Sequence, residues 1–130
     1  ALGAPQLSSL LLSSLSPDIY SSPSAIKQLV ARLQANPGAS WSNEVMAQVA
    51  NMSMSQLHQR FRQMFGMSPQ AWLTELRIKE AQRWLRGTSL PIAEIALRTG
   101  FSDQASLTRT MQRVSAITPA VYRKAQKHAG

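Results

Sequence analysis

An internal repeat with a period of about 50 residues limits the folds that this chain can adopt. At an offset of 50 the matched pairs are Leu57 and Leu107, Phe61 and Met111, Met64 and Val114, Met67 and Ile117, Ser68-Pro69 and Thr118-Pro119, and Trp72 and Tyr122. Upstream the offset is 49, with Met46-Ala47 matching Ile95-Ala96, Asn51 matching Gly100, Met52 matching Phe101 and Ser53 matching Ser102. The second copy therefore has one extra residue in its turn region, and the repeat predicts two similar lobes.

Each copy predicts a short helix, a turn and a longer helix. The turn falls at Asn51 or Gly100 and favours a left-handed backbone, which glycine adopts freely and asparagine tolerates better than most residues. The small residues Ala47 and Ala96 precede the turns, where two crossing helices must approach closely. This arrangement is typical of a helix-turn-helix.

Capping and helix-breaking residues predict an all-α fold of seven helices. The longest would have about 18 residues and a length of about 27 Å. In chain order, the expected helices run from about Pro23 to Ala35, from the N-cap Ser42 to about Ala50, from the capping box at Ser53 and Gln56 to Gly66, from Ser68-Pro69 to Gly87, from about Leu90 to Arg98 with Gly100 at the end, from the N-cap Ser102, and from Thr118-Pro119 toward Lys127.

These helices predict four segments. Residues 1–22 are poor in charge and rich in serine and leucine, and we expect a linker or arm there. The first helix-turn-helix lobe would span residues 23–67, the connecting helix residues 68–87, and the second lobe residues 88–130.

Positive charge is concentrated in the second half of the chain. The whole sequence has 14 Lys and Arg against 6 Asp and Glu, a net charge of +8. Residues up to Gln59 contain two bases and two acids, whereas residues from Arg60 onward contain twelve bases and four acids. A localised excess of this size predicts a polyanionic partner, with nucleic acid favoured over an anionic membrane.

Other functional classes have little support. The chain has no cysteine, so disulfides, thiolate metal sites and cysteine nucleophiles are excluded. Ser24 and Lys27 have the serine–lysine spacing of penicillin-interacting enzymes, but they lie on a short amphipathic helix without a partner acid or amide. The leucine-rich stretch from Leu7 to Leu15 is broken by serines and falls short of the about 20 apolar residues that a membrane span needs. We therefore expect a soluble protein that is not an enzyme and that binds no metal or cofactor.

The sequence around the two predicted helix-turn-helix units resembles the signature of the AraC/XylS family of bacterial transcription regulators. The resemblance covers about residues 25–125 and rests on Ser53 through Trp72, Arg77, Ala81, Leu85, Ile92 through Ala96, and Gly100-Phe101. It implies two helix-turn-helix lobes joined by a long helix, binding to bacterial promoters with activation favoured over repression, and RNA polymerase as a further partner. The second lobe departs from the family pattern of aromatic residues and a Gly-Ser-Pro ending, with Leu107, Met111, Ser115 and Ala116-Ile117-Thr118-Pro119 at these positions.

The third predicted helix would present one apolar and one polar face. We expect burial of Leu57, Phe61, Met64 and Phe65, and exposure of Ser55, Gln56, Gln59, Arg62 and Gln63. Glutamine can bond adenine with two hydrogen bonds, and arginine can bond guanine or phosphate. The family resemblance adds His58 as a base contact. We expect base reading by Ser55, Gln56, His58 and Gln59, while a glutamine-rich face that is merely solvated is the alternative.

The sixth predicted helix would bury Leu107, Met111 and Val114 and expose Ala105, Ser106, Arg109, Gln112 and Arg113. The resemblance implies base reading by Gln104, Ala105, Ser106, Thr108 and Arg109. Arg109 is the strongest candidate, and Ala105 could make only an apolar contact. We expect the DNA backbone to be held by Arg62, Arg113, Arg123 and Lys124 and by the helix starts at Ser53 and Ser102.

The two reading helices differ at equivalent positions, Gln59 against Arg109, so we expect an asymmetric double-stranded DNA site. The long helix can separate the lobes by about one turn of DNA, about 34 Å, so that both reading helices enter successive major grooves.

The sequence also suggests how the chain fits into a whole protein and where that protein acts. It opens without Met and on a linker-like segment, which favours a fragment of a longer regulator with a missing N-terminal effector or dimerisation domain over a complete small regulator. The expected location is the cytoplasm, at the nucleoid. A helical protein-interaction module or an anionic-membrane binder is the alternative function.

Overall fold

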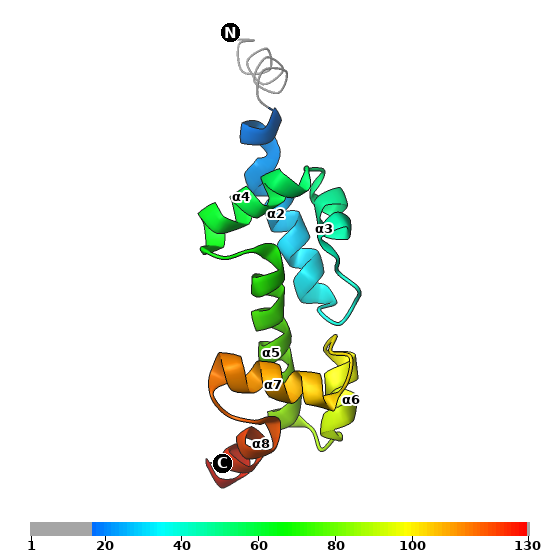
Figure 1. Cartoon of the computed structure of the whole chain (residues 1–130), viewed down its shortest axis with the longest axis vertical. Helices are drawn as coiled ribbons and strands as arrows, with labels where there is room; N and C mark the ends of the chain where they lie inside the picture. The colour runs from blue at the N-terminus through cyan, green and yellow to red at the C-terminus, as the bar shows by residue number, and fades with distance from the viewer. Residues whose placement is uncertain (1–16, 130) are drawn as a thin grey trace. The chain divides into compact units, whose positions relative to one another are not determined.

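The computed structural model describes the backbone of residues 17–129 and the side chains of residues 24–127. Over these residues the chain is all-α, with seven helices and no strand, as the sequence predicts. The helices are α2 (Pro17–Ala35), α3 (Asn43–Ala50), α4 (Met54–Phe65), α5 (Pro69–Gly87), α6 (Ile92–Arg98), α7 (Gln104–Ser115) and α8 (Pro119–Ala129), which Figure 1 shows in chain order.

Three helix starts differ from the prediction, those of α2 and α6 and, by one residue, that of α7. The first helix begins at Pro17 instead of Pro23, so residues 17–22 are helical, and the rest of the predicted linker or arm lies outside the described residues. Proline fits the first turn of a helix at either place, so this signal alone does not distinguish the two starts. The short helix α6 begins at Ile92, with Pro91 as its N-cap, two residues after the predicted start at Leu90.

The described chain divides into two compact units. The first comprises the described residues up to Arg32 together with Trp41–Pro69, and the second comprises Leu33–Ser40 together with the described residues from Gln70 onward. The sequence assigns residues 68–87 to a connecting helix of their own. In the structure nearly all of this helix, α5, belongs to the second unit, because its apolar side is buried in that unit's core.

The core of the first unit comes from three helices, and α3 packs against α4 within it. Small residues on α3 allow the close approach of the two helices, since Ala47 is 5% exposed and Ala50 is 2% exposed. The remaining buried side chains of this core are Ile26 and Leu29 from α2, Met46 from α3, and Leu57 and Phe61 from α4.

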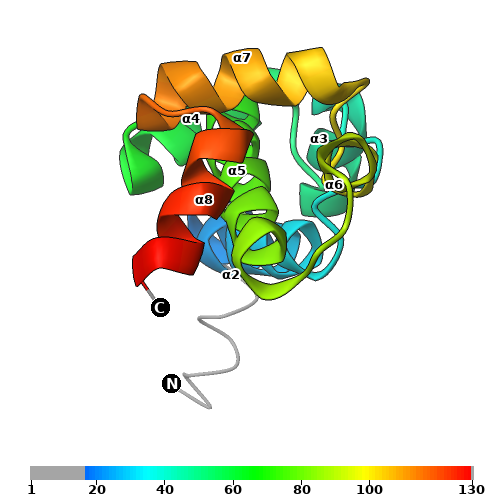
Figure 2. The same ribbon diagram turned by 90° about the horizontal axis from the view of Figure 1, so that it is seen from below.

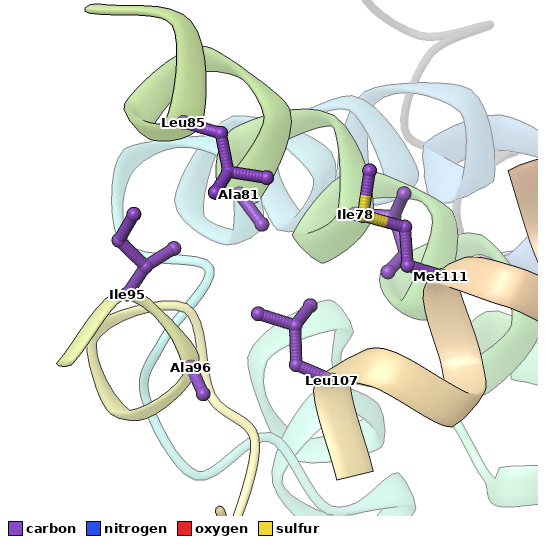
Figure 3. Packing of buried hydrophobic residues seen from close by; sticks show 7 residues of the cluster. All are labelled: Ile78, Ala81, Leu85, Ile95, Ala96, Leu107 and Met111. Atoms are coloured by element: carbon purple, nitrogen blue, oxygen red, sulfur yellow. The ribbon is translucent and has the colours of Figure 1, made fainter. Parts of the chain in front are cut away.

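The second unit has a core of the same kind, built by α5, α6 and α7. In Figure 3 the side chains from the three helices point toward one another, and they are Ile78, Ala81, Leu85, Ile95, Ala96, Leu107 and Met111. Partly buried Trp84, Phe101 and Tyr122 pack against this cluster. Helix α6 lies near the start of α7 and α8 near its end (Figures 1 and 2).

The repeat is confirmed at the level of packing. Residues 57–69 and 107–119 have the same order of buried, half-buried and exposed positions, residue for residue. Both copies have a left-handed residue after the short helix, Asn51 with φ 55° and Gly100 with φ 96°. The chain therefore folds one helix-turn-helix plan twice, each time with its own core.

Candidate nucleic-acid interface

The helix α4 has well-defined ends. Its start is the predicted capping box, in which Ser53 Oγ accepts a hydrogen bond from the Gln56 backbone N–H at 3.1 Å and Gln56 Oε1 accepts one from the Ser53 backbone N–H at 3.0 Å. Its end is the predicted Gly66, with φ 73°. These caps fix a helix of 12 residues, Met54–Phe65.

The helix α7 also has 12 residues, but its N-cap differs from the prediction. The cap is Asp103 instead of Ser102, and its Oδ1 accepts a hydrogen bond from the Ser106 backbone N–H at 2.7 Å. Asp103 lies 50 residues after Ser53, so the extra residue of the second copy is Ser102, in the bend before the helix. An offset of 50 applied to the cap as well as to the core would have found Asp103.

The buried sides of α4 and α7 are shorter than predicted. Leu57 and Phe61 on α4, and Leu107 and Met111 on α7, are fully buried. Met64 and its counterpart Val114, however, are 43% and 41% exposed, which corrects their assignment to the core. Phe65 is half-buried, with its ring 5.1 Å from that of Phe61. A helical period identifies one side of a helix, but it does not show how far along that side the neighbouring helices extend.

The predicted base-reading residues lie away from the buried side of their helices. On α4, Ser55 and Gln59 are exposed and Gln56 and His58 are half-buried; on α7, Gln104, Ala105 and Arg109 are exposed and Ser106 and Thr108 are half-buried. In the pairs that the offset of 50 defines, Ser55 corresponds to Ala105, Gln56 to Ser106, His58 to Thr108 and Gln59 to Arg109. The two helices thus carry different side chains at positions of the same burial.

Two of the α4 side chains are already hydrogen-bonded within the helix, and this limits what they can offer a base. His58 Nδ1 lies 2.9 Å from the backbone carbonyl oxygen of Met54, so Nδ1 donates its proton there and Nε2 of a neutral ring is an acceptor. Gln56 uses its carbonyl oxygen in the capping box, where it accepts the hydrogen bond from the Ser53 backbone N–H.

The predicted backbone contacts fall into two groups. The first group has exposed side chains and consists of Ser53, Arg62, Ser102, Arg113 and Lys124. Arg123 is half-buried, and it donates from Nε to the Leu85 carbonyl oxygen and from a terminal nitrogen to the Thr88 carbonyl oxygen, both at 3.2 Å. Arg123 therefore caps the C-terminal end of α5, a structural role that the sequence did not reveal.

Other kinds of site have no support in the described part of the chain. No group of three or more His, Cys, Asp or Glu side chains there is arranged to hold a metal ion. Among the described helices, none combines the length and the apolar character needed to cross a bilayer.

Comparison with known proteins agrees with this geometry. A family model described as a helix-turn-helix domain matches residues 46–125. The chain is 30% identical over 96 residues to the HTH-type transcriptional regulator MtrA of Neisseria gonorrhoeae, covering 74% of this chain and 32% of MtrA. It is 30% identical over 112 residues to the HTH-type transcriptional activator RhaS of Enterobacter sp. (strain 638), covering 86% of this chain and 40% of RhaS. The chain thus spans about a third of the length of such relatives.

Two solved structures share the fold. One is an AraC-type transcriptional regulator from Chromobacterium violaceum, with a TM-score of 0.77, 29% identity, and coverage of 84% of this chain and 97% of that one. The other is the DNA-binding domain of the global transcriptional factor AdpA in complex with a target DNA, with a TM-score of 0.77, 30% identity, and coverage of 79% and 93%. The relatives are transcription regulators and not enzymes. The chain belongs to the AraC-type family of helix-turn-helix DNA-binding domains of transcription regulators.

Proposed function

We propose that α4 and α7 read base edges in two different half-sites of one double-stranded DNA site, in successive major grooves. The observation that supports this proposal most strongly is the pair of 12-residue helices with matching burial and different outward chemistry. Two helices of the same length and burial would dock on DNA in the same way, and their different exposed side chains would select different bases. The site would therefore be asymmetric.

In the first half-site, Gln59 would bond the N6 and N7 edge of an adenine. His58 would accept a hydrogen bond at Nε2 from an exocyclic amine, because Nδ1 is directed to the Met54 carbonyl. Ser55 and Gln56 lie at the N-terminal turn, which a reading helix usually places against base edges.

In the second half-site, Arg109 would bond O6 and N7 of a guanine through its planar guanidinium. Ala105 would contact a thymine methyl group, which is the only base contact available to its side chain. The remaining readers on α7 would be Gln104, Ser106 and Thr108.

The DNA backbone would be held by exposed Arg62, Arg113 and Lys124 and by the helix start at Ser53. Ser102 would contribute its hydroxyl only, because the Asp103 carboxylate occupies the start of α7 and repels a phosphate placed there. Arg123 would offer the N–H groups that do not hold the carbonyls of Leu85 and Thr88.

At the level of the whole protein, we propose that the chain is the DNA-binding part of a longer bacterial transcription activator. It would act at the nucleoid in the cytoplasm, with RNA polymerase as a partner and an N-terminal effector or dimerisation domain. Two observations support this proposal: the chain spans only about a third of the length of these relatives, and RhaS is a transcriptional activator.

Selection of bound duplexes from random DNA tests the proposed reading. We expect enrichment of a non-palindromic site with two half-sites about 10 base pairs apart. Gln59→Ala should relax base preference in one half-site. Gln63→Ala is the matched control, because Gln63 is an exposed glutamine on the same helix and is not one of the proposed readers. Its Oε1 accepts a hydrogen bond from a terminal nitrogen of Arg60 at 3.4 Å. Enrichment of a palindrome, or equal effects of the two variants, would contradict the proposal.

A further inference from the structure

The loop between α2 and α3 has an unusual place in the fold. Residues 36–40, which we term the strap, follow α2 and precede α3 in the chain. The strap is tightly turned, with the Ala39 backbone N–H donating to the Asn36 carbonyl oxygen at 3.3 Å. Most of α2 and all of α3 belong to the first unit, but the strap belongs to the second. It therefore packs with helices that follow it by about 40 residues.

An arginine side chain holds the strap. Arg77 on α5 donates from Nε to the Pro37 carbonyl oxygen and from a terminal nitrogen to the Ala39 carbonyl oxygen, both at 2.8 Å. Hydrogen bonds from a charged donor are stronger than neutral ones, and two carbonyls fix the plane of the guanidinium. Arg77 is half-buried, and desolvation lowers the pKa of its guanidinium below the ordinary value.

The same guanidinium lies directly against the turn of the second helix-turn-helix. A Cβ atom added to Gly100 would lie 2.5 Å from Arg77 Nε and 2.7 Å from Cζ, so a side chain there would displace the guanidinium. On the other side, a Cβ atom added to Gly38 in the strap would collide with the backbone carbonyl oxygen of Arg98, at the end of α6. Strap, guanidinium and turn thus pack in mutual contact.

This turn determines where α7 begins. The Phe101 backbone N–H donates to the Ala96 carbonyl oxygen at 2.9 Å, and the N-cap of α7 follows at Asp103. In the first copy the residue at the equivalent position, Asn51, carries a side chain and is exposed. The Arg77 guanidinium therefore packs against the turn that leads into the second reading helix.

We propose that Arg77 is a positioning residue for DNA reading by α7. By holding the strap against the turn at Gly100, its guanidinium fixes the direction in which α7 leaves the turn. Base preference in the second half-site then depends on a side chain that touches no base. This inference rests on the proposed function of α7 as a reading helix.

The test uses the whole chain and compares base preference in the two half-sites. Arg77→Met removes both hydrogen bonds. Arg77→Lys keeps the positive charge and can donate to one of the two carbonyls. Lys79→Met is the control, because it removes one charge from the exposed side of α5. Binding is measured to the selected duplex and to duplexes with single base changes. We expect Arg77→Met to reduce discrimination in the second half-site about tenfold and to leave the first half-site unchanged. Arg77→Lys should restore part of this discrimination, and Lys79→Met should change neither half-site.

Equal loss in both half-sites would show a general effect on stability and overturn the proposal, and so would unchanged discrimination. If Arg77→Met does not fold, Arg77→Lys decides by the same criterion. Amide hydrogen exchange without DNA separates this inference from the proposed function. Faster exchange at Gly100 and Phe101 in Arg77→Lys is expected whether or not α7 reads bases, and unchanged exchange would show that the guanidinium does not hold the turn. Absence of sequence preference in the wild type would contradict the proposed function alone.

Discussion

Gly100→Asn should strongly destabilise the second unit, although asparagine occupies the equivalent turn of the first. Two costs add at this position. The φ of 96° is unfavourable for a residue with a Cβ atom, by about 1–2 kcal/mol. The new Cβ atom would also displace the Arg77 guanidinium and weaken two charged hydrogen bonds, each worth about 1.5–3 kcal/mol. Because the displacement breaks these bonds only in part, we expect a total loss of about 3–5 kcal/mol.

Urea unfolding followed by far-ultraviolet circular dichroism measures this loss. With a denaturant slope of about 2 kcal/mol per molar, the midpoint of the second unit should fall by about 2 M. Asn51→Gly is the matched control, and we expect a change within about 0.5 kcal/mol, because Asn51 is exposed and glycine accepts its φ of 55°. If the two variants unfold at the same midpoint, the contact between Arg77 and the turn does not stabilise the fold.

Three further predictions concern the cores, a helix end and binding. Phe61→Ala should destabilise the first unit by about 3–5 kcal/mol, because the side chain is fully buried; a melting temperature equal to the wild type would refute this. Ala116→Gly should raise stability by about 1 kcal/mol in urea unfolding, since Ala116 has a φ of 69°, and a decrease would contradict the strain argument. DNA affinity should fall steeply and linearly with salt on logarithmic axes, and constant affinity between about 50 and about 200 mM would exclude phosphate contacts.

Local signals predicted the parts of the fold that local chemistry determines. The capping box at Ser53 and Gln56 and the glycine stop at Gly66 act within a few residues, and the structure confirms each of them. The left-handed turns at Asn51 and Gly100 are confirmed for the same reason. The offset of the repeat then places the two helix-turn-helix units in the chain, which is most of the fold.

Features that depend on distant contacts could not be predicted. Met64 and Val114 continue the apolar period of their helices, but their exposure depends on where the neighbouring helices end. Arg77 belongs to the family signature, yet its bonds reach carbonyls 38 and 40 residues earlier in the chain. The cap at Asp103 was missed for a different reason, because Ser102 beside it is an equally good capping residue. The assignment of individual readers on α4 and α7 stays a prediction.

The central claim is that the two helices read bases, and the binding of Arg109→Ala tests it most directly. Its affinity would be measured for the selected duplex, for each single base change and for scrambled DNA, with Arg113→Ala as the control on the same exposed side of α7. We predict a loss of about 1–3 kcal/mol on the selected duplex, relaxed preference at one position and little change on scrambled DNA. Arg113→Ala should weaken all duplexes nearly equally and reduce the salt slope by about one. If Arg109→Ala weakens selected and scrambled DNA by the same factor, Arg109 contacts the backbone and α7 does not read bases through it.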